Sequence, residues 1–152
     1  MTEPHWAERY GWKLFMHPAF RRQYDALIAD VESLKVSLSP ESFAAHGRVK
    51  LLARVNKLVL DDIPADPQAK MYELGNTLGP NRRHWRRAKF FQRFRLFFRF
   101  QSTANIIVYA WMNDERTLRA RGARTDVYEA FKRRLLSGDP PDGWDQLLDD
   151  CT

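Results

Sequence analysis

The segment from Arg82 to Phe100 constrains this chain more than any other part of it. It reads RRHWRRAKFFQRFRLFFRF and contains eight Arg or Lys residues, seven aromatic residues and no carboxylate. Side chains alternate between the two faces of a β-strand. From position 93 to 100 one face collects Phe94, Leu96, Phe98 and Phe100, and the other collects Arg93, Arg95, Phe97 and Arg99. We therefore expect a strand whose first face lies on the core and whose second face is exposed.

The residues before this strand fit a second strand that pairs with it. From position 85 to 91 the same alternation places Trp85, Arg87, Lys89 and Phe91 on one side. A hairpin that turns through residues 91–93 brings Arg87, Lys89 and Arg95 onto one exposed patch. Guanidinium groups bind phosphate and aromatic rings stack on unpaired bases, so nucleic acid is the first partner to consider. A basic, solvated sheet face is the alternative, although the absence of carboxylates removes the salt bridges that usually accompany one.

Length and composition predict one domain over residues 1–152. A chain of 152 residues with 44% hydrophobic content can bury one core. Its 25 basic and 19 acidic residues give a net charge of +6, which suits a polyanionic partner. The five Asp residues from position 138 onward are accompanied by no Lys or Arg. We therefore expect a short acidic tail from about residue 138, either solvated or resting on the basic face.

Nothing in the sequence indicates secretion, membrane insertion or disulfide formation. Cys151 is the single cysteine, which excludes an internal disulfide and a multi-cysteine zinc site. No apolar run reaches transmembrane length, and the polar start MTEPHWAERY lacks the apolar core of a signal peptide. We expect a cytoplasmic protein with no membrane partner.

The first third of the chain predicts one strand and two helices. The apolar run from Gly11 to His17 is expected to be a strand. Apolar residues then recur at spacings of three and four from Ala19 to about Leu38, which predicts an amphipathic helix. Ser39, followed by Pro40 and Glu41, is expected to cap a second helix that ends at about Leu60.

The remaining elements complete an α+β fold. Residues 61–81 are rich in Asp, Pro, Gly and Asn and are expected to form an irregular connection to the hairpin. The apolar run from Asn105 to Met112 is expected to be a strand buried on both faces. Thr125 is expected to cap a last helix that ends at Gly138. The predicted order is an N-terminal strand, two helices, an antiparallel sheet and a C-terminal helix.

The residue patterns of most enzyme classes are missing. The four His residues show no HxxxH or HExxH spacing, and the chain has no Gly-rich phosphate loop and no GxSxG motif. We therefore expect neither a metal site nor a cofactor, and chemistry has to use Arg, Lys, Tyr or backbone groups. RNA cleavage fits that set. The neighbouring 2′-hydroxyl is a built-in nucleophile, so the protein needs only to position it, move a proton and stabilise charge on phosphorus.

Several stretches of the sequence resemble the YhaV toxins, which belong to the RelE-like ribonuclease superfamily of type II toxin–antitoxin systems. They include GWKLFMHP at Gly11, WRRAKF at Trp85, RFRLFFRF at Arg93 and WMNDERTLRARGARTDVYEAF at Trp111. The resemblance covers the chain from about residue 11 to residue 144. Similarity to the wider superfamily rests on the element order, the Phe94-Arg95-Leu96 motif, a basic loop over residues 119–124 and a helix that bears Tyr128.

The resemblance implies a RelE-like fold and an mRNA interferase that blocks translation, either on free mRNA or on the ribosome. It also implies silencing by a co-expressed antitoxin of the swapped-hairpin, PrlF-like class. Any DNA binding would then come from the antitoxin complex, since this chain lacks a helix-turn-helix or zinc signature.

Together with the strand pattern, the resemblance implies a catalytic set of Arg87, Lys89, Arg95 and Tyr128. Arg87 and Arg95 would hold the scissile phosphate, and Lys89 would accept a proton or add positive charge. Tyr128 would stack on a base or transfer a proton, although it also lies on the apolar side of its helix and suits the core equally well. The further candidate RNA-binding residues are Trp85, Arg93, Phe97, Arg99, Arg119, Arg121 and Arg124.

A non-catalytic function is the alternative to a nuclease. A basic protein that binds RNA or the ribosome, and inhibits or regulates by occupancy alone, would carry the same surface. Both functions predict salt-dependent RNA binding. They differ in whether the RNA is covalently changed.

Overall fold

Five strands form one mixed sheet in the order β1-β2-β5-β4-β3. The computed structural model describes residues 5–152. The strands are β1 (Ala7–Arg9), β2 (Trp12–Met16), β3 (Arg86–Phe90), β4 (Phe94–Gln101) and β5 (Ile106–Met112). Three pairings are antiparallel, and β2 pairs in parallel with β5. The predicted α+β layout, the hairpin and the fully buried strand β5 are confirmed.

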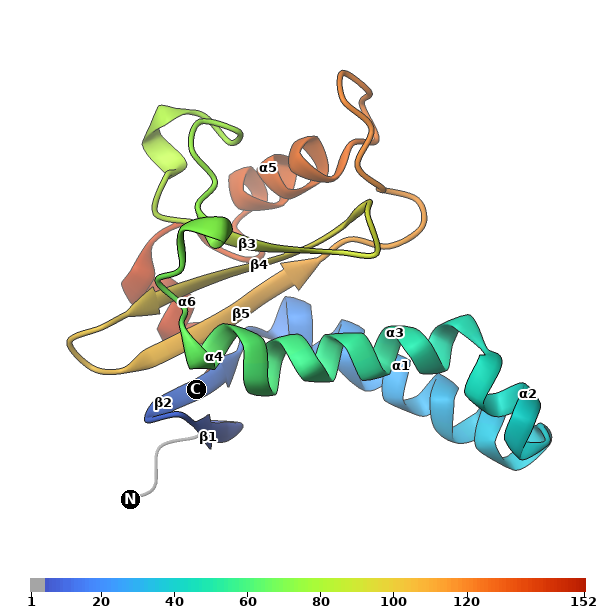
Figure 1. Ribbon diagram of the computed structural model, residues 1–152. Helices are drawn as coiled ribbons and strands as arrows, with labels where there is room; N and C mark the ends of the chain where they lie inside the picture. The colour runs from blue at the N-terminus through green and yellow to red at the C-terminus, as the bar shows by residue number, and fades with distance from the viewer. Residues whose placement is uncertain (1–4) are drawn as a thin grey trace.

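Helices cover both faces of this sheet (Figure 1). The helices are α1 (Pro18–Ser37), α2 (Pro40–Ala45), α3 (Gly47–Lys57), α4 (Ile63–Ala65), α5 (Val127–Ser137) and α6 (Trp144–Asp150). A π-helical turn (Leu58–Asp62) joins α3 to α4, and two 3-10 turns (Lys70–Tyr72 and Pro80–Arg82) lie in the connection to β3. Within residues 5–152 no helix has the length and apolarity that crossing a bilayer requires.

Each face of the sheet has its own core. Leu96 and Phe98 of β4 pack with residues of α1 and α3, so the predicted core face is confirmed. The opposite face was expected to be exposed, and that prediction is wrong. Phe97 is fully buried there among residues of α5, such as Phe131. The reason is that the apolar stripe of α5 needs a partner surface, and this side of the sheet supplies it.

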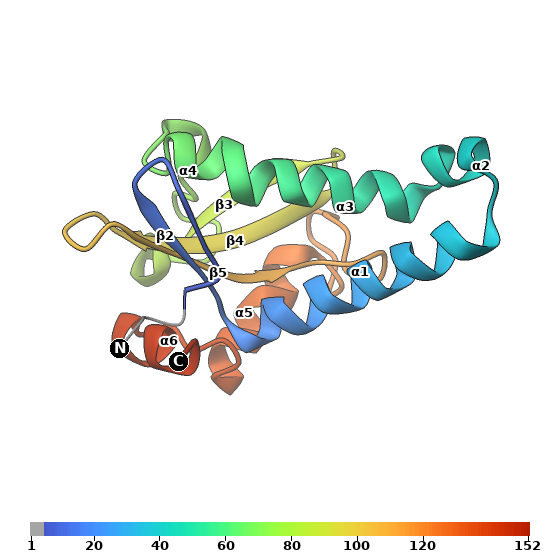
Figure 2. The ribbon, with the colours of Figure 1, turned by 90° about the horizontal axis from the view of Figure 1, so that it is seen from below.

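The second predicted helix is broken into shorter pieces. Ser39 caps α2 as expected, its hydroxyl accepting from the Ser42 amide. His46 then takes an extended conformation (φ −70°, ψ 137°), and its Nδ1 accepts from the Arg48 amide to begin α3. Figure 2 shows the resulting geometry, with α1 and α3 side by side and α2 at their far end.

The C-terminal segment is a packed element and not a solvated tail. It contains α6, whose Leu147 is fully buried. Ahead of the helix, the Asp142 carboxylate accepts from Trp85 Nε1 at 2.7 Å and contacts His84 Nε2 at 2.9 Å. His17 Nδ1 accepts from the Ala19 amide, so its Nε2 carries the proton that is donated to Asp150. The acidic residues therefore fasten the C-terminus to the sheet and to α1.

Candidate active site

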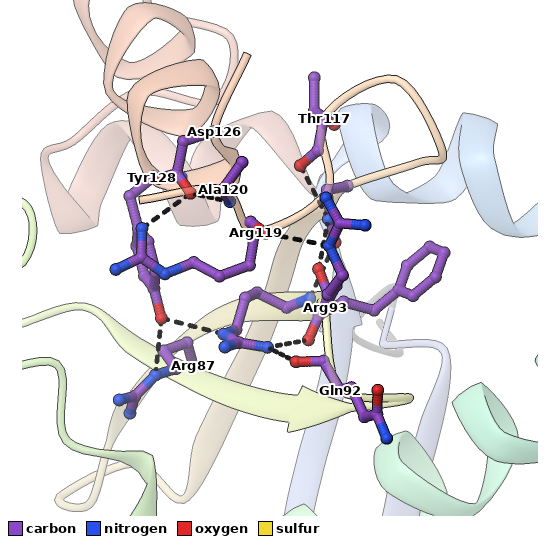
Figure 3. Close-up of polar contacts among 11 residues, drawn as sticks. Arg87, Gln92, Arg93, Thr117, Arg119, Ala120, Asp126 and Tyr128 are labelled. Atoms are coloured by element: carbon purple, nitrogen blue, oxygen red, sulfur yellow. Dashed lines mark hydrogen bonds and ion pairs between the residues drawn. The ribbon is translucent and has the colours of Figure 1, made fainter. Parts of the chain in front are cut away.

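The hydroxyl of Tyr128 is the point where three of the four predicted catalytic residues meet. It accepts hydrogen bonds from Arg87 Nε at 3.0 Å and from Arg95 Nε at 3.1 Å (Figure 3). These three residues come from α5, β3 and β4. Two guanidinium groups thus converge on one phenolic oxygen. Tyr128 is only 5% exposed and packs in the core beneath α5, as the sequence pattern allowed, but among the described residues no group accepts its hydroxyl proton.

Strand register explains why the two arginines share a face. Arg87 lies opposite Phe97, and Lys89 lies opposite Arg95. Directly opposed residues of an antiparallel pair point to the same side, so the expected grouping of Arg87, Lys89 and Arg95 is reproduced in register. Tyr128 is the second residue of α5, which packs on this face of the sheet, so its hydroxyl reaches the two arginines.

Burial separates the roles of these residues. Arg95 was expected on an exposed patch, but it is only 6% exposed. Its Nη1 donates to the backbone carbonyls of Gln92 at 2.9 Å and Phe94 at 2.8 Å, so its guanidinium is held on several sides. Arg95 is therefore corrected from an exposed phosphate clamp to a buried group that fixes the Tyr128 hydroxyl.

Arg87 and Lys89 remain open to solvent. Arg87 is half-buried, and its Nη1 donates to the carbonyls of Glu73 at 2.7 Å and Met71 at 3.3 Å. These bonds orient its guanidinium toward Tyr128 while one edge stays accessible. Lys89 is exposed. Register keeps Lys89 on the same strand face as Arg95, but Lys89 also lines a separate pocket with Lys57 of α3, and no contact among the described residues joins it to Tyr128.

Asp126 organises the other side of Tyr128. Its carboxylate is 2% exposed and accepts from the amides of Ala120 at 2.6 Å and Tyr128 at 3.0 Å. It also pairs with Arg119 Nη1 at 2.7 Å. Burial raises the pKa of Asp126, but these hydrogen bonds and the Arg119 charge more than offset it, so the pKa lies below its usual value. The side chain remains an anion that both caps α5 and holds Arg119.

Arg119 lies over the ring of Tyr128. Its guanidinium carbon is 4.8 Å from the ring centroid, a cation–π distance. The Arg119 backbone forms a pair of contacts with Arg93, whose carbonyl accepts from the Arg119 amide and whose Nε donates to the Arg119 carbonyl, both at 3.0 Å. Arg93 is thus committed to holding the loop after β5, although its side chain stays exposed.

Asn113 fastens the same loop to β4. Its Oδ1 accepts from the Arg95 amide at 2.8 Å, and its Nδ2 donates to the carbonyls of Arg93 at 3.1 Å and Thr117 at 2.9 Å. Asn113 and Asp126 were missed by the sequence analysis. Both residues could have been identified from the sequence. Asn113 directly follows a buried strand, and Asp126, a residue type that caps helices well, directly precedes a helix. The prediction that Thr125 caps the last helix is wrong, because Asp126 is the N-cap of α5.

Two predicted base-stacking residues are interior. Trp85 and Phe97 both have 0% exposure. Phe97 stacks on Phe131 with ring centroids 4.0 Å apart, and Trp85 meets the same ring edge-on at 5.0 Å. Neither ring has a free face for a base, so both are corrected to core residues.

Arg99 also belongs to the packing of the C-terminal segment. Its guanidinium lies between the rings of Trp85 and Trp144, at 5.6 and 5.4 Å, and donates to the Asp142 carbonyl at 2.6 Å. Burial lowers the pKa of Arg99, and the nearby Asp142 charge opposes that shift. Four strand residues, or about 13 Å, separate Arg99 from Arg95. The structure does not bring Arg99 to the Tyr128 site.

The predicted basic loop divides into two kinds of residue. Arg119 and Arg124 line an open cleft of about 410 Å³ beside Tyr128. Arg121 is exposed on the same loop but does not line the cleft. The site therefore consists of a phenol held by two guanidiniums, a third guanidinium on its ring, and a basic cleft next to it. Such a group of cations can bind a phosphodiester and stabilise additional negative charge on it.

Comparison with known proteins agrees with this chemistry. A family model described as a toxin with endonuclease activity, of a toxin–antitoxin system, matches residues 14–152. The chain is 42% identical over 139 residues to the ribonuclease toxin YhaV of Escherichia coli K12, covering 90% of each chain. The same identity and coverage relate it to the toxins YhaV of the O6:H1 and O157:H7 strains. No solved structure matches significantly. A toxin–antitoxin system implies an antitoxin partner, and this chain belongs to the YhaV family of endonuclease toxins.

Proposed function

We propose that this toxin cleaves mRNA by attack of the substrate's own 2′-hydroxyl at the Tyr128 site. The observation that supports it most is the Tyr128 hydroxyl, which accepts from Arg87 and Arg95 and keeps its own proton available. A phenol held in this way is oriented for proton transfer to a reacting oxygen. Cleavage of mRNA would inhibit translation and growth, and it would take place in the cytoplasm.

The reaction needs one bond to form and one to break. The 2′-oxygen attacks phosphorus and loses its proton, while the bond from phosphorus to the 5′-oxygen breaks and that oxygen gains a proton. A water molecule accepts the proton of the 2′-hydroxyl, and Tyr128 donates a proton to the leaving 5′-oxygen and then regains one from solvent. Arg87 and Lys89, the two accessible cations, stabilise the negative charge on the phosphoryl oxygens. The products are a 2′,3′-cyclic phosphate and a 5′-hydroxyl.

We propose that the antitoxin neutralises the toxin by direct contact. The cognate antitoxin, of the swapped-hairpin class, covers the Tyr128 site and blocks access of RNA. The ribosome is proposed to act at most as a carrier that presents mRNA, since Arg87, Lys89 and Tyr128 of this chain supply the reacting groups. DNA binding by the complex is assigned to the antitoxin.

Incubation of the purified toxin with end-labelled RNA, with and without ribosomes, tests the proposal. Cleavage should leave a 2′,3′-cyclic phosphate and should continue in EDTA, because guanidinium and ammonium groups supply the charge stabilisation. RNA with 2′-deoxy substitution at the scissile nucleotide should bind but resist cleavage. Normal cleavage of that substrate, or 5′-phosphate products, would contradict the mechanism. Binding without any cleavage would favour the non-catalytic alternative.

Substitution of the accessible cations tests the site itself. Arg87→Ala and Lys89→Ala should each lower the cleavage rate about 10²–10³-fold, as deletion of one charge-stabilising donor does elsewhere. Arg21 is exposed on α1, far in sequence from Arg87 and Lys89. Arg21→Ala removes the same charge and should leave the cleavage rate unchanged. Folded Arg87→Ala and Lys89→Ala variants with parental rates would show that the site is misplaced.

A further inference from the structure

The cleft beside Tyr128 contains two arginines that form no ion pair within the described chain. Three segments form it: residue 77 of the connection before β3, residues 119–126 of the loop after β5, and the first turns of α5. Arg124 and Arg133 line it together with Arg119. Arg119 is paired with Asp126 at 2.7 Å. Arg124 and Arg133 have neither an ion pair nor a side-chain hydrogen bond among residues 5–152.

An anion fits this arrangement better than any other ligand. Three guanidinium groups and two carboxylates, those of Asp126 and Glu129, line the cleft, so its lining is net positive. A phosphate can accept bidentate hydrogen bonds from the two arginines that form no ion pair. The cleft is also continuous with the candidate site, because Tyr128 forms part of its wall. A polymer whose scissile phosphate lies at the Tyr128 hydroxyl has a neighbouring phosphate one nucleotide away, and the cleft that Tyr128 itself lines is the candidate place for it.

We propose that this cleft is a subsite for the phosphate of the nucleotide next to the scissile bond, with Arg124 and Arg133 as its ligands. The inference rests on the proposed ribonuclease function. Arg133 was not among the residues singled out in the sequence. It lies on α5 about two turns beyond the N-terminus, and the fold brings it into the same cleft as Arg124.

Substitution of Glu129 tests the subsite, because its effect on RNA binding should be opposite to that of the arginine substitutions. It is an exposed carboxylate that lines the same cleft, one residue after Tyr128. If the cleft holds a phosphate, Glu129 repels it, and removal of this charge strengthens binding. Removal of Arg124 or Arg133 weakens binding. A general effect of net charge on RNA affinity can be measured separately with Arg21 and Glu32 of α1, which are exposed and do not line the cleft.

The experiment measures binding of a uniformly 2′-O-methylated oligonucleotide, which keeps every phosphate but lacks the nucleophile. Fluorescence anisotropy over a range of salt concentrations gives the dissociation constant and its salt dependence. We expect Arg124→Ala and Arg133→Ala to weaken binding about tenfold each and to lower the salt slope by about 0.7, the value for one phosphate contact on a single strand. Glu129→Gln should tighten binding several-fold. Arg21→Ala and Glu32→Gln should change the dissociation constant less than twofold.

The outcomes separate the subsite from the nuclease function. Equal effects of the cleft variants and the α1 variants would show that only net charge matters and would overturn the subsite. Tighter binding by Arg133→Ala, or weaker binding by Glu129→Gln, would overturn it as well. Because the oligonucleotide cannot be cleaved, these results do not depend on whether Tyr128 is catalytic. Failure of the proposed reaction would instead appear as unchanged cleavage of ordinary RNA by Tyr128 variants.

Discussion

Replacement of Tyr128 by Phe removes one oxygen atom and tests both the stability and the chemistry of the site. The ring stays in place, so its contacts with Phe97 and with Arg119 are retained. The hydroxyl is lost, and the Nε groups of Arg87 and Arg95 lose their common acceptor. Two effects follow, one on folding and one on catalysis, and the structure gives a magnitude for each.

The stability cost comes mainly from Arg95. Its side chain is buried, so its Nε remains without an acceptor, which costs about 1–3 kcal/mol. Arg87 is half-buried and can bond to water instead. For a domain of this size each kcal/mol lowers the melting temperature by about 2–4 °C, so we expect a fall of about 2–12 °C. A typical stability of about 5–15 kcal/mol leaves the variant folded at 25 °C.

The catalytic cost is larger than the stability cost. Loss of a positioned proton donor lowers rates about 10²–10⁴-fold. Tyr24→Phe is the matched control, because the Tyr24 hydroxyl is also buried and donates to Asn56 at 2.6 Å, on the other face of the sheet. That variant should keep its activity and lose less stability, because the half-buried Asn56 can bond to water instead. A Tyr128→Phe enzyme that cleaves RNA at the parental rate, or a Tyr24→Phe enzyme that is equally inactive, would refute the assignment.

Two further predictions concern the carboxylates that hold the site and the C-terminus. Asp126→Asn should lower both stability and the cleavage rate, because an amide cannot accept from Ala120, Tyr128 and Arg119 at once. Since the pKa of Asp126 is depressed, its contribution to stability is complete above the unfolded value of about 4 and is lost as pH falls through the folded value. Urea unfolding from neutral to acidic pH should therefore show a shallower acid loss in the variant, and an unchanged pH profile would contradict this. Asp142→Ala should release α6 from Trp85. Hydrogen exchange should then accelerate at Leu147 but not in β5, and equal protection of α6 in both proteins would show that Asp142 does not hold it.

Local patterns in the sequence predicted much of the sheet. Strict alternation identified the face that Leu96 and Phe98 bury, and an uninterrupted apolar run identified β5 as an interior strand. The cap at Ser39 and the left-handed Gly138 at the end of α5 were also correct. These features depend on residues close together in the chain, and their chemistry is sufficient to specify them.

Errors arose where distant segments decide the outcome. Phe97 alternates with arginines, which favours an exposed face, but α5 covers that face. The pattern of β4 carries no information about where a helix some thirty residues later will pack. The sequence left open whether the acidic segment is solvated or rests on the basic face, and it did not predict α6. Trp144, Leu147 and Leu148 have helical spacing and all pack in the core that α5 covers, while Asp142 contacts His84 and Trp85.

The hairpin turn between β3 and β4 is best understood as part of the site. Phe91 and Gln92 both have left-handed backbones, with φ of 45° and 64°, which costs a bulky residue about 1–3 kcal/mol. This conformation directs the Gln92 carbonyl toward Arg95 Nη1, at 2.9 Å. A hydrogen bond to a buried charged group contributes about 1.5–3 kcal/mol, which is enough to offset the strain of one such residue. A buried guanidinium needs several acceptors, and the turn adds the Gln92 carbonyl to the Phe94 carbonyl that β4 supplies to the same Nη1. The strained turn therefore helps to hold the buried Arg95 guanidinium beneath α5, where it orients the Tyr128 hydroxyl.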